Sequence, residues 1–476
     1  MVKDFFKAFS KTASGSLLSM IFGALLVKIL AVFSGTQGVG IFSLFRDFTK
    51  TLSLIFSLNA NIAIVQGLSD DSLSTKETYY NNALKIIIVN LSVIGLILLL
   101  CMDSIKEYFF SDFNFISTSS LTFLLLAAVF GCFNVVFSAV LNANRSLGYM
   151  ASSQVIGAFC GLLSAYPLIN ILPAQYAFVG VLLVINGSWL IANIYFLNRL
   201  GIKLQLHESL VTKVEKDNAR RFTTLAFASL ITGVAGMCTI LFVRFKIEAN
   251  YGISILGIFD AAWTLGTVYV VFILSSLNSF ILPMFVSRST SVEQSVHVNT
   301  TIKIVFLLFT PLIITMMTFS DELVLFFYTA EFAGSAEILE LFLIGDVFKV
   351  VSWILGIKLL AANRSFAFII TSLIWDALFI SAISILTDLG IVGIAYSYVL
   401  TQVIYFVILI FVSNRIFGFK MNFSSFFLML LVFSLVLVSY SSPDFATQFI
   451  FYVIFCTIYL ALFVYFLKFN RNWFSL

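Results

Sequence analysis

Long apolar runs alternate with short polar segments along the whole chain. A helix that crosses a bilayer needs about 20 mostly apolar residues, because lipid offers no partner to an unpaired backbone group. Fourteen segments satisfy this rule, and we therefore expect an all-α polytopic membrane protein with about 14 transmembrane helices. The segments are 12–34, 38–66, 81–101, 117–141, 147–170, 173–197, 219–246, 252–287, 297–319, 334–361, 365–387, 390–414, 421–440 and 445–467.

Composition supports a chain that resides in lipid. Apolar residues make up 61% of the 476 and charged residues 11%, and the mean hydropathy is +1.06. A soluble domain carries roughly 25% charged residues. The five cysteines are scattered and the two histidines, His207 and His297, stand alone. The sequence therefore predicts no metal site and no cofactor, and it gives no sign of a nucleic-acid partner.

Lys and Arg residues are distributed unevenly between the two sides of the predicted membrane segments. If the N-terminus is cytoplasmic, nineteen of the 27 lie in inside segments and five within spans. Only Lys106, Arg244 and Lys246 lie at outside ends. Cytoplasmic segments of membrane proteins carry an excess of Lys and Arg, so this asymmetry predicts that both termini are cytoplasmic. The N-terminal run has no clear cleavage site, and we expect it to be an uncleaved first span.

Two pairs of similar turns indicate an internal duplication. Residues 141–147 (LNANRSL) resemble 360–366 (LAANRSF), and 40–42 resemble 257–259 (both GIF). Parallel repeats are a recurring transporter design in which the substrate path lies between the two halves. The predicted organisation is an N-terminal six-helix lobe (1–200), a cytoplasmic linker (201–217), a C-terminal six-helix lobe (218–417) and two extra C-terminal helices (418–476).

Charged residues inside the predicted spans are the candidate functional residues. An ionised group in mid-bilayer costs at least ~2.5 kcal/mol, so such groups usually face a bundle interior or water. Arg46 and Lys50 are four residues apart and therefore lie on one helix face. With Lys28 they give spans 1 and 2 three cations against one anion, Asp47. A cationic, hydrated cavity between the lobes suits an anionic passenger that carries phosphate or pyrophosphate.

The candidates fall into two groups with different expected roles. The proposed substrate-binding residues are Lys28, Arg46, Lys50, Arg244 and Lys349. The proposed ion-coupling or gating residues are Asp260, Asp346 and Asp376, with a proton or a sodium ion as the coupling ion.

Structural roles are the alternative for several of these residues. Asp346 and Lys349 are three residues apart and could neutralise each other. Asp47, next to Arg46, could tie two helices together. Arg244 and Lys358 could extend along their helices to place their charged groups at a membrane interface.

Four segments resemble Wzx-type polysaccharide flippases, which share a superfamily (MOP) with MATE-type multidrug antiporters and the lipid II flippases. They are KILAVFSGTQGVGIFSLFRD (28–47), ILPMFVSR (281–288), IGDVFKV (344–350) and GIVGIAYSYVLTQVIYF (390–406). The resemblance runs over roughly residues 10–417, and the first and third segments are its more specific parts. The two C-terminal helices are a departure, because many relatives end near the equivalent of Arg415.

The resemblance implies a MATE-like V-shaped pair of lobes in the bacterial inner membrane that works by alternating access. The implied cargo is an undecaprenyl-pyrophosphate-linked repeat unit of O-antigen, enterobacterial common antigen or capsule, which moves from the cytoplasmic to the periplasmic leaflet for lipopolysaccharide or other surface polysaccharide. Lys28 and Arg46 match positions that hold a basic residue in the family motif, and Arg244 occupies a similar place in span 7. The implied partner proteins are a polysaccharide polymerase and a chain-length regulator.

Two other functions compete with this interpretation. A cation-coupled multidrug antiporter shares the expected fold, but its cavity would more often be acidic. A membrane glycosyltransferase or polymerase usually presents a large outer loop with catalytic residues, whereas the first outer turn here is only residues 34–37 and no acid–base pair is predicted outside the membrane. We therefore expect a transporter and not an enzyme.

Overall fold

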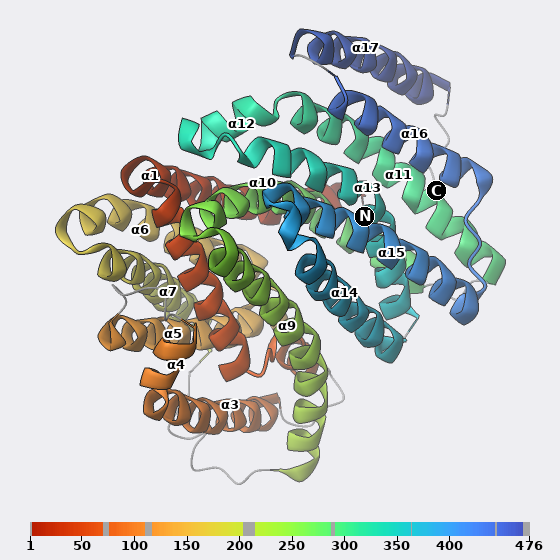
Figure 1. Ribbon diagram of the computed structural model, residues 1–476. Coiled ribbons are helices and arrows are strands. Elements are labelled where there is room, and N and C mark those ends of the chain that lie inside the picture. Colours follow the sequence, from red (N-terminus) through yellow and green to blue (C-terminus); the bar gives the residue numbers. More distant parts are fainter. Residues whose placement is uncertain are drawn as a thin grey trace. The chain divides into compact units, whose positions relative to one another are not determined.

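The structure is a computed structural model that describes residues 2–69, 76–109, 117–202, 215–286, 291–362, 364–442 and 445–469. Every regular element in these ranges is helical (Figure 1). All fourteen apolar segments predicted from the sequence coincide with described helices. Most of the predicted linker, residues 203–214, lies outside the described residues, as does His207.

The chain divides into two compact units. Unit 1 contains residues 1–260 and 327–331, and unit 2 contains 261–326 and 332–476. This division assigns residues 216–260 to the first unit. The lobe boundaries derived from the repeat remain a prediction.

The helices of unit 1 follow the first seven predicted spans. They are α1 (Val2–Phe56), α2 (Asn61–Ser69), α3 (Lys76–Leu100), α4 (Met102–Phe109), α5 (Thr118–Ala143), α6 (Leu147–Ile171), α7 (Ala174–Arg199), α9 (Lys216–Tyr251) and the start of α10 (Ile253–Val286).

Unit 2 contains the remaining helices. They are the rest of α10, α11 (Ser291–Thr318), α12 (Ser320–Phe327), part of the short helix η1 (Ala330–Phe332), α13 (Ser335–Ala361), α14 (Ser365–Leu386), η2 (Thr387–Leu389), α15 (Ile391–Phe417), α16 (Phe423–Tyr440) and α17 (Phe445–Phe469). The two similar turns of the predicted repeat join α5 to α6 and α13 to α14.

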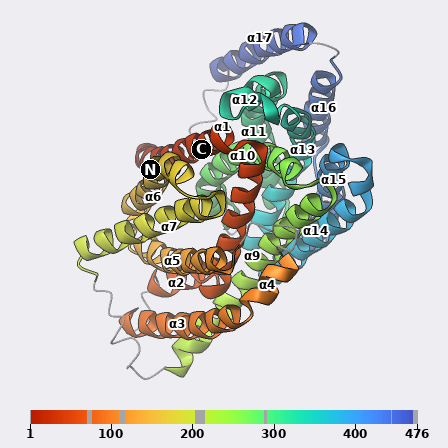
Figure 2. The same cartoon turned by 60° about the vertical axis from the view of Figure 1, so that its left-hand side comes forward.

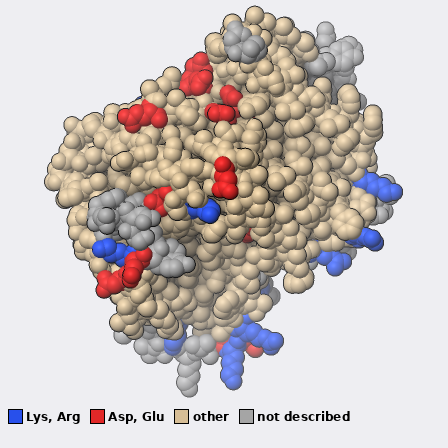
Figure 3. Space-filling view, in the orientation of Figure 1, with Lys and Arg blue, Asp and Glu red and all other residues tan. Residues whose placement is uncertain are grey.

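Eleven helices in the described part of the chain are long and apolar enough to cross a membrane. The difference from fourteen has three local reasons. The element α1 contains the first predicted span and most of the second, as two helices that meet at a kink at Gly35 and are counted as one. Helix α13 contains five charged side chains, and the described side chains of α17 extend only to Leu460. The protein is a multi-pass integral membrane protein, and the exposed face in Figure 3 carries few charged side chains.

In unit 1, α1 packs against α5 and α6, and α7 packs against both α5 and α6 (Figure 2). The kink in α1 occurs where Gly35 has φ +60° and ψ −162°, a conformation that only glycine adopts without strain. It separates the half of α1 that carries Lys28 from the half that carries Arg46 and Lys50.

The two outer turns of the predicted repeat lie against each other in unit 1. A β-carbon at Gly40 would meet the carbonyl oxygen of Ile253 at 2.5 Å, and one at Gly257 would meet the carbonyl oxygen of Thr36 at 2.0 Å. Only glycine permits this approach, so the paired glycines let α1 and α10 cross backbone to backbone. This contact holds the charged middle part of α1 next to the start of α10.

A short break separates α1 from α2 within the second predicted span. Leu58 and Asn59 both have positive φ there. The side chain of Asn90 donates to the carbonyl oxygens of residues 55 and 56, and Asn59 donates to the carbonyl of Ser229 on α9 at 2.8 Å. Side-chain donors thus satisfy backbone carbonyls that the helix break releases, as lipid requires.

In unit 2, α13 is the central helix, with α11, α14, α15 and α16 packed around it. Its apolar residues are buried over most of its length. Trp263 of α10 stacks on Phe379 of α14 and meets Phe342 of α13 and Tyr398 of α15 edge-on. These rings join four helices around the buried carboxylate described below.

Candidate functional site

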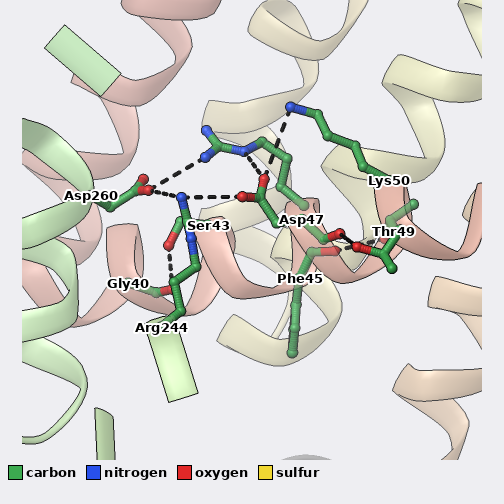
Figure 4. A network of polar contacts seen from close by, with 10 residues as sticks. Gly40, Ser43, Phe45, Asp47, Thr49, Lys50, Arg244 and Asp260 are labelled. Carbon is green, nitrogen blue, oxygen red and sulfur yellow. Dashed lines mark hydrogen bonds and ion pairs between the residues drawn. The ribbon is translucent and has the colours of Figure 1, made fainter. Parts of the chain in front are cut away.

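Two carboxylates and a buried arginine form the centre of a charged cluster in unit 1. Arg244 of α9 has no exposed side-chain surface. Its Nη2 lies 2.5 Å from an Asp260 carboxylate oxygen and 3.1 Å from an Asp47 carboxylate oxygen (Figure 4). Because Asp260 is on α10 and Asp47 on α1, Arg244 joins three helices through charge.

Two more cations from α1 approach the same carboxylates. The Nε of Arg46 donates to Asp47 at 3.0 Å, and its Nη2 donates to Asp260 at 3.4 Å. The ammonium of Lys50 lies 3.9 Å from Asp47. The proposed tie through Asp47 is therefore present, and it reaches Arg244 as well as its neighbours on α1.

The five side chains have an excess of one positive charge, and that excess lies on the accessible side. The exposed fraction of the side chain is 57% for Lys50 and 22% for Arg46, compared with 0% for Arg244. Arg244 Nε and Nη1 are buried and have no hydrogen-bond partner among the described residues. Lys50 and Arg46 therefore keep part of their side chains accessible, whereas Arg244 is buried between the two carboxylates.

Lys28 lies on the other half of α1, beyond the Gly35 kink. Its ammonium donates a hydrogen bond to the backbone carbonyl of Tyr328. Tyr328 is buried and lies near Arg46. Lys28 and Arg46 are therefore both close to a residue that the sequence did not single out.

Unit 2 contains a second, smaller cluster around Asp346 of α13. Asp346 is 1% exposed. One carboxylate oxygen accepts a hydrogen bond from Tyr269 of α10 at 2.5 Å, and the other accepts one from Tyr398 of α15 at 2.6 Å. Lys349 Nζ lies 3.4 Å from Asp346 and donates to the Tyr398 hydroxyl at 2.9 Å. The expected pairing of Asp346 with Lys349 is present and gives a neutral cluster.

Two further charged residues of unit 2 are Asp376 and Lys358. Asp376 of α14 is buried and lies near Tyr405 of α15. Lys358 is buried, with its ammonium 5.9 Å from the centre of the Phe417 ring. Its placement at the membrane interface remains a prediction. The described side chains contain no group of three or more His, Cys, Asp or Glu residues that could hold a metal ion.

Sequence reasoning missed the tyrosines of both clusters. The hydroxyls of Tyr269 and Tyr398 donate hydrogen bonds to Asp346. The backbone carbonyl of Tyr328 accepts one from Lys28. Tyrosine is common in apolar spans, so its presence gave no signal. Only the helix packing shows which of the 17 tyrosines meets a carboxylate.

Comparisons with known proteins identify the fold. No family model matches the chain. The Lipid III flippase of Escherichia coli (strain K12) is 22% identical over 410 residues, which cover 84% of this chain and 96% of the relative. The structure of the Lipid II flippase MurJ, inward closed conformation, superimposes with a TM-score of 0.71 at 14% identity and covers 97% of this chain and 99% of the other.

A multidrug resistance MATE family transporter of the MOP superfamily, in its outward-facing conformation, superimposes with a TM-score of 0.63 at 13% identity. It covers 86% of this chain and 95% of the other. The chain has the fold of the MOP superfamily. The MOP fold includes the two C-terminal helices here, because the match to the MurJ structure extends over nearly the whole chain.

Proposed function

We propose that this protein is a flippase for anionic lipid-linked precursors. In this proposal it moves undecaprenyl-pyrophosphate-linked oligosaccharide repeat units from the cytoplasmic to the periplasmic leaflet of the bacterial inner membrane, with both termini in the cytoplasm. The glycan then serves surface polysaccharide assembly, for which a polymerase and a chain-length regulator are the proposed partners.

The excess of positive charge on α1 carries the proposal. Arg46 and Lys50 keep part of their charged ends accessible within a transmembrane segment, where an unused charge would be costly. Guanidinium and ammonium groups bind phosphate oxygens through charge-assisted hydrogen bonds. A diphosphate headgroup would satisfy both cations at once.

The relatives and the remaining charged residues give further support. Both the curated relative and the MurJ structure are named as flippases of lipids, and neither name describes an enzyme. Lys349, whose side chain is 28% exposed, is a further proposed substrate-binding residue. Asp260, Asp346 and Asp376 are the proposed sites for a coupling proton or sodium ion.

A cation-coupled multidrug antiporter is the competing proposal, because a MATE transporter shares the fold. Cationic drugs need a net-negative site. The unit 1 cluster has the opposite sign, with three cations against two carboxylates among its five described residues. The charge balance therefore favours an anionic cargo.

The test is replacement of Arg46 and Lys50 by alanine in cells that depend on the protein for a surface glycan. Each lost charge-assisted contact is worth about 1.5–3 kcal/mol. We therefore expect at least a tenfold fall in surface glycan at an unchanged protein level, and accumulation of the lipid-linked precursor, since about 1.4 kcal/mol is a factor of ten.

The matched control is the double variant Arg415→Ala and Lys420→Ala, which removes two exposed cations outside both clusters. It should leave the glycan unchanged. Normal glycan in the Arg46 and Lys50 variant would contradict the flippase proposal. Loss of drug tolerance after gene deletion, without precursor accumulation, would favour the antiporter.

A further inference from the structure

Five residues that begin at the end of α12 and precede α13 are part of unit 1, the unit that contains the cation cluster. Residues Phe327–Glu331 belong to unit 1, although the chain on both sides of them belongs to unit 2. We call these five residues the strap. A segment with this placement can move only if its contacts with α1 break.

The first contact of the strap occupies a proposed cargo-binding cation. The backbone carbonyl of Tyr328 accepts a hydrogen bond from the Lys28 ammonium. The Tyr328 side chain is 2% exposed, so its ring is packed against neighbouring side chains. Arg46 lies near the same tyrosine. A single strap residue therefore neighbours the cations on both sides of the α1 kink.

The second contact lies at the kink itself. A β-carbon at Gly35 would come within 2.8 Å of a carboxylate oxygen of Glu331. The strap thus places a carbonyl oxygen and a carboxylate close to α1, and both are acceptor groups of the kind that phosphate oxygens provide. In this position the Tyr328 carbonyl accepts the Lys28 hydrogen bond that a phosphate oxygen of an anionic headgroup would otherwise accept.

One group in the strap is poorly satisfied in this position. The Thr329 hydroxyl oxygen is buried and makes no hydrogen bond with any described residue. A buried polar group without a partner disfavours the state in which it is buried. The Tyr328 contact with Lys28 therefore holds the strap against an opposing contribution from Thr329, and a competing ligand can displace it more easily.

We propose that the strap is a reversible internal cover of the cation site, which occupies Lys28 and adjoins Arg46 until an anionic lipid headgroup takes its place. The nature of the cargo in this proposal rests on the proposed function. In the proposed orientation the connection from α11 to α13 lies on the outer side. The strap would then close the outer end of the site. It would move away from the site when the headgroup is released outward.

The binding test uses the full-length protein in lipid nanodiscs, with farnesyl diphosphate as the probe. When only a fraction of the protein is competent to bind, the apparent affinity falls by that fraction. Tyr328→Ala removes the ring that anchors the strap. It should tighten probe binding by about tenfold, whereas Tyr328→Phe, which keeps the ring, should change it by less. Combining Tyr328→Ala with Lys28→Met should abolish the gain.

The control variant is Phe326→Ala, since Phe326 precedes the strap and is 73% exposed. It should bind the probe like the unaltered protein. A Tyr328→Ala protein that keeps the thermal transition of the unaltered protein and binds the probe no better would overturn the proposal.

A second measurement follows the strap without any cargo. In a chain whose five native cysteines are replaced by alanine, Thr329→Cys should react slowly with a membrane-impermeant maleimide. Phe326→Cys is the fast reference. Adding Tyr328→Ala should accelerate the reaction of Thr329→Cys by about tenfold.

The two measurements separate this proposal from the proposed function. Thr329→Cys that reacts as fast as Phe326→Cys in the presence of Tyr328 would overturn the strap. Labelling that accelerates as expected, while farnesyl diphosphate binds no variant, would support the strap as a cover and contradict an anionic diphosphate cargo.

Discussion

The two units each hold buried carboxylates, but they neutralise them differently. In unit 1, Asp47 and Asp260 are met by three cations on two helices. In unit 2, Asp346 is met by one lysine and two tyrosine hydroxyls. The first cluster has one more positive than negative charge, and the second cluster is neutral.

This difference indicates different roles for groups that look alike in the sequence. A neutral, fully bonded cluster such as that of Asp346 ties helices together and offers little to a charged ligand. A cluster with a surplus cation at its accessible edge attracts an anion, because in low dielectric its charge is weakly screened. The comparison therefore favours unit 1 for the main headgroup contact in the proposed function, and it indicates that the tyrosines of unit 2 contribute to helix packing.

Replacing Arg244 should have the largest effect on stability. Its removal would leave two buried carboxylates without their shared partner, and breaking a buried ion pair in this way costs about 3–5 kcal/mol. We expect Arg244→Ala to lower the thermal midpoint of the purified protein strongly and to reduce its level in cells. Arg244→Lys, which keeps the charge, should lose less. An unchanged midpoint for Arg244→Ala would show that the cluster does not hold α9 to α1.

Removing one tyrosine hydroxyl from unit 2 should have a moderate effect. A hydrogen bond to a charged group contributes about 1.5–3 kcal/mol. We expect Tyr269→Phe to lower stability by about this amount and to leave transport per folded molecule unchanged. Transport measured against protein level tests this. A transport defect at full stability would contradict this expectation and show that the hydrogen bond from Tyr269 is needed for the coupling role proposed for Asp346.

Replacing Lys349 should have the smallest effect on transport. Its ammonium is already neutralised by Asp346, so less of its charge is available to a ligand than that of Lys50. We expect Lys349→Ala to reduce surface glycan by about threefold or less, in line with the small contribution of a partly exposed ion pair. Lys50→Ala should reduce it more. The reverse order would contradict the assignment of the headgroup to unit 1.

Much of the fold was predictable because the signal is local. The kink at Gly35 falls in the gap between the first two predicted spans, and the remaining apolar segments coincide with helices. Lys349 and Asp346 pair as their spacing of three on one helix suggests. In contrast, Lys28 bonds to a residue 300 positions away, and no local pattern could indicate that partner.

The sequence by itself determined that this chain lies in a membrane and where its helices run, because backbone hydrogen bonding and the cost of exposing polar groups to lipid act on each segment separately. It also located the charged residues in the spans. Only the tertiary structure decided which charges meet. Asp260 forms ion pairs with Arg244 and Arg46 because close contacts at glycines bring α10 against α1. Such pairing depends on distances of a few ångströms between helices that are far apart in the chain.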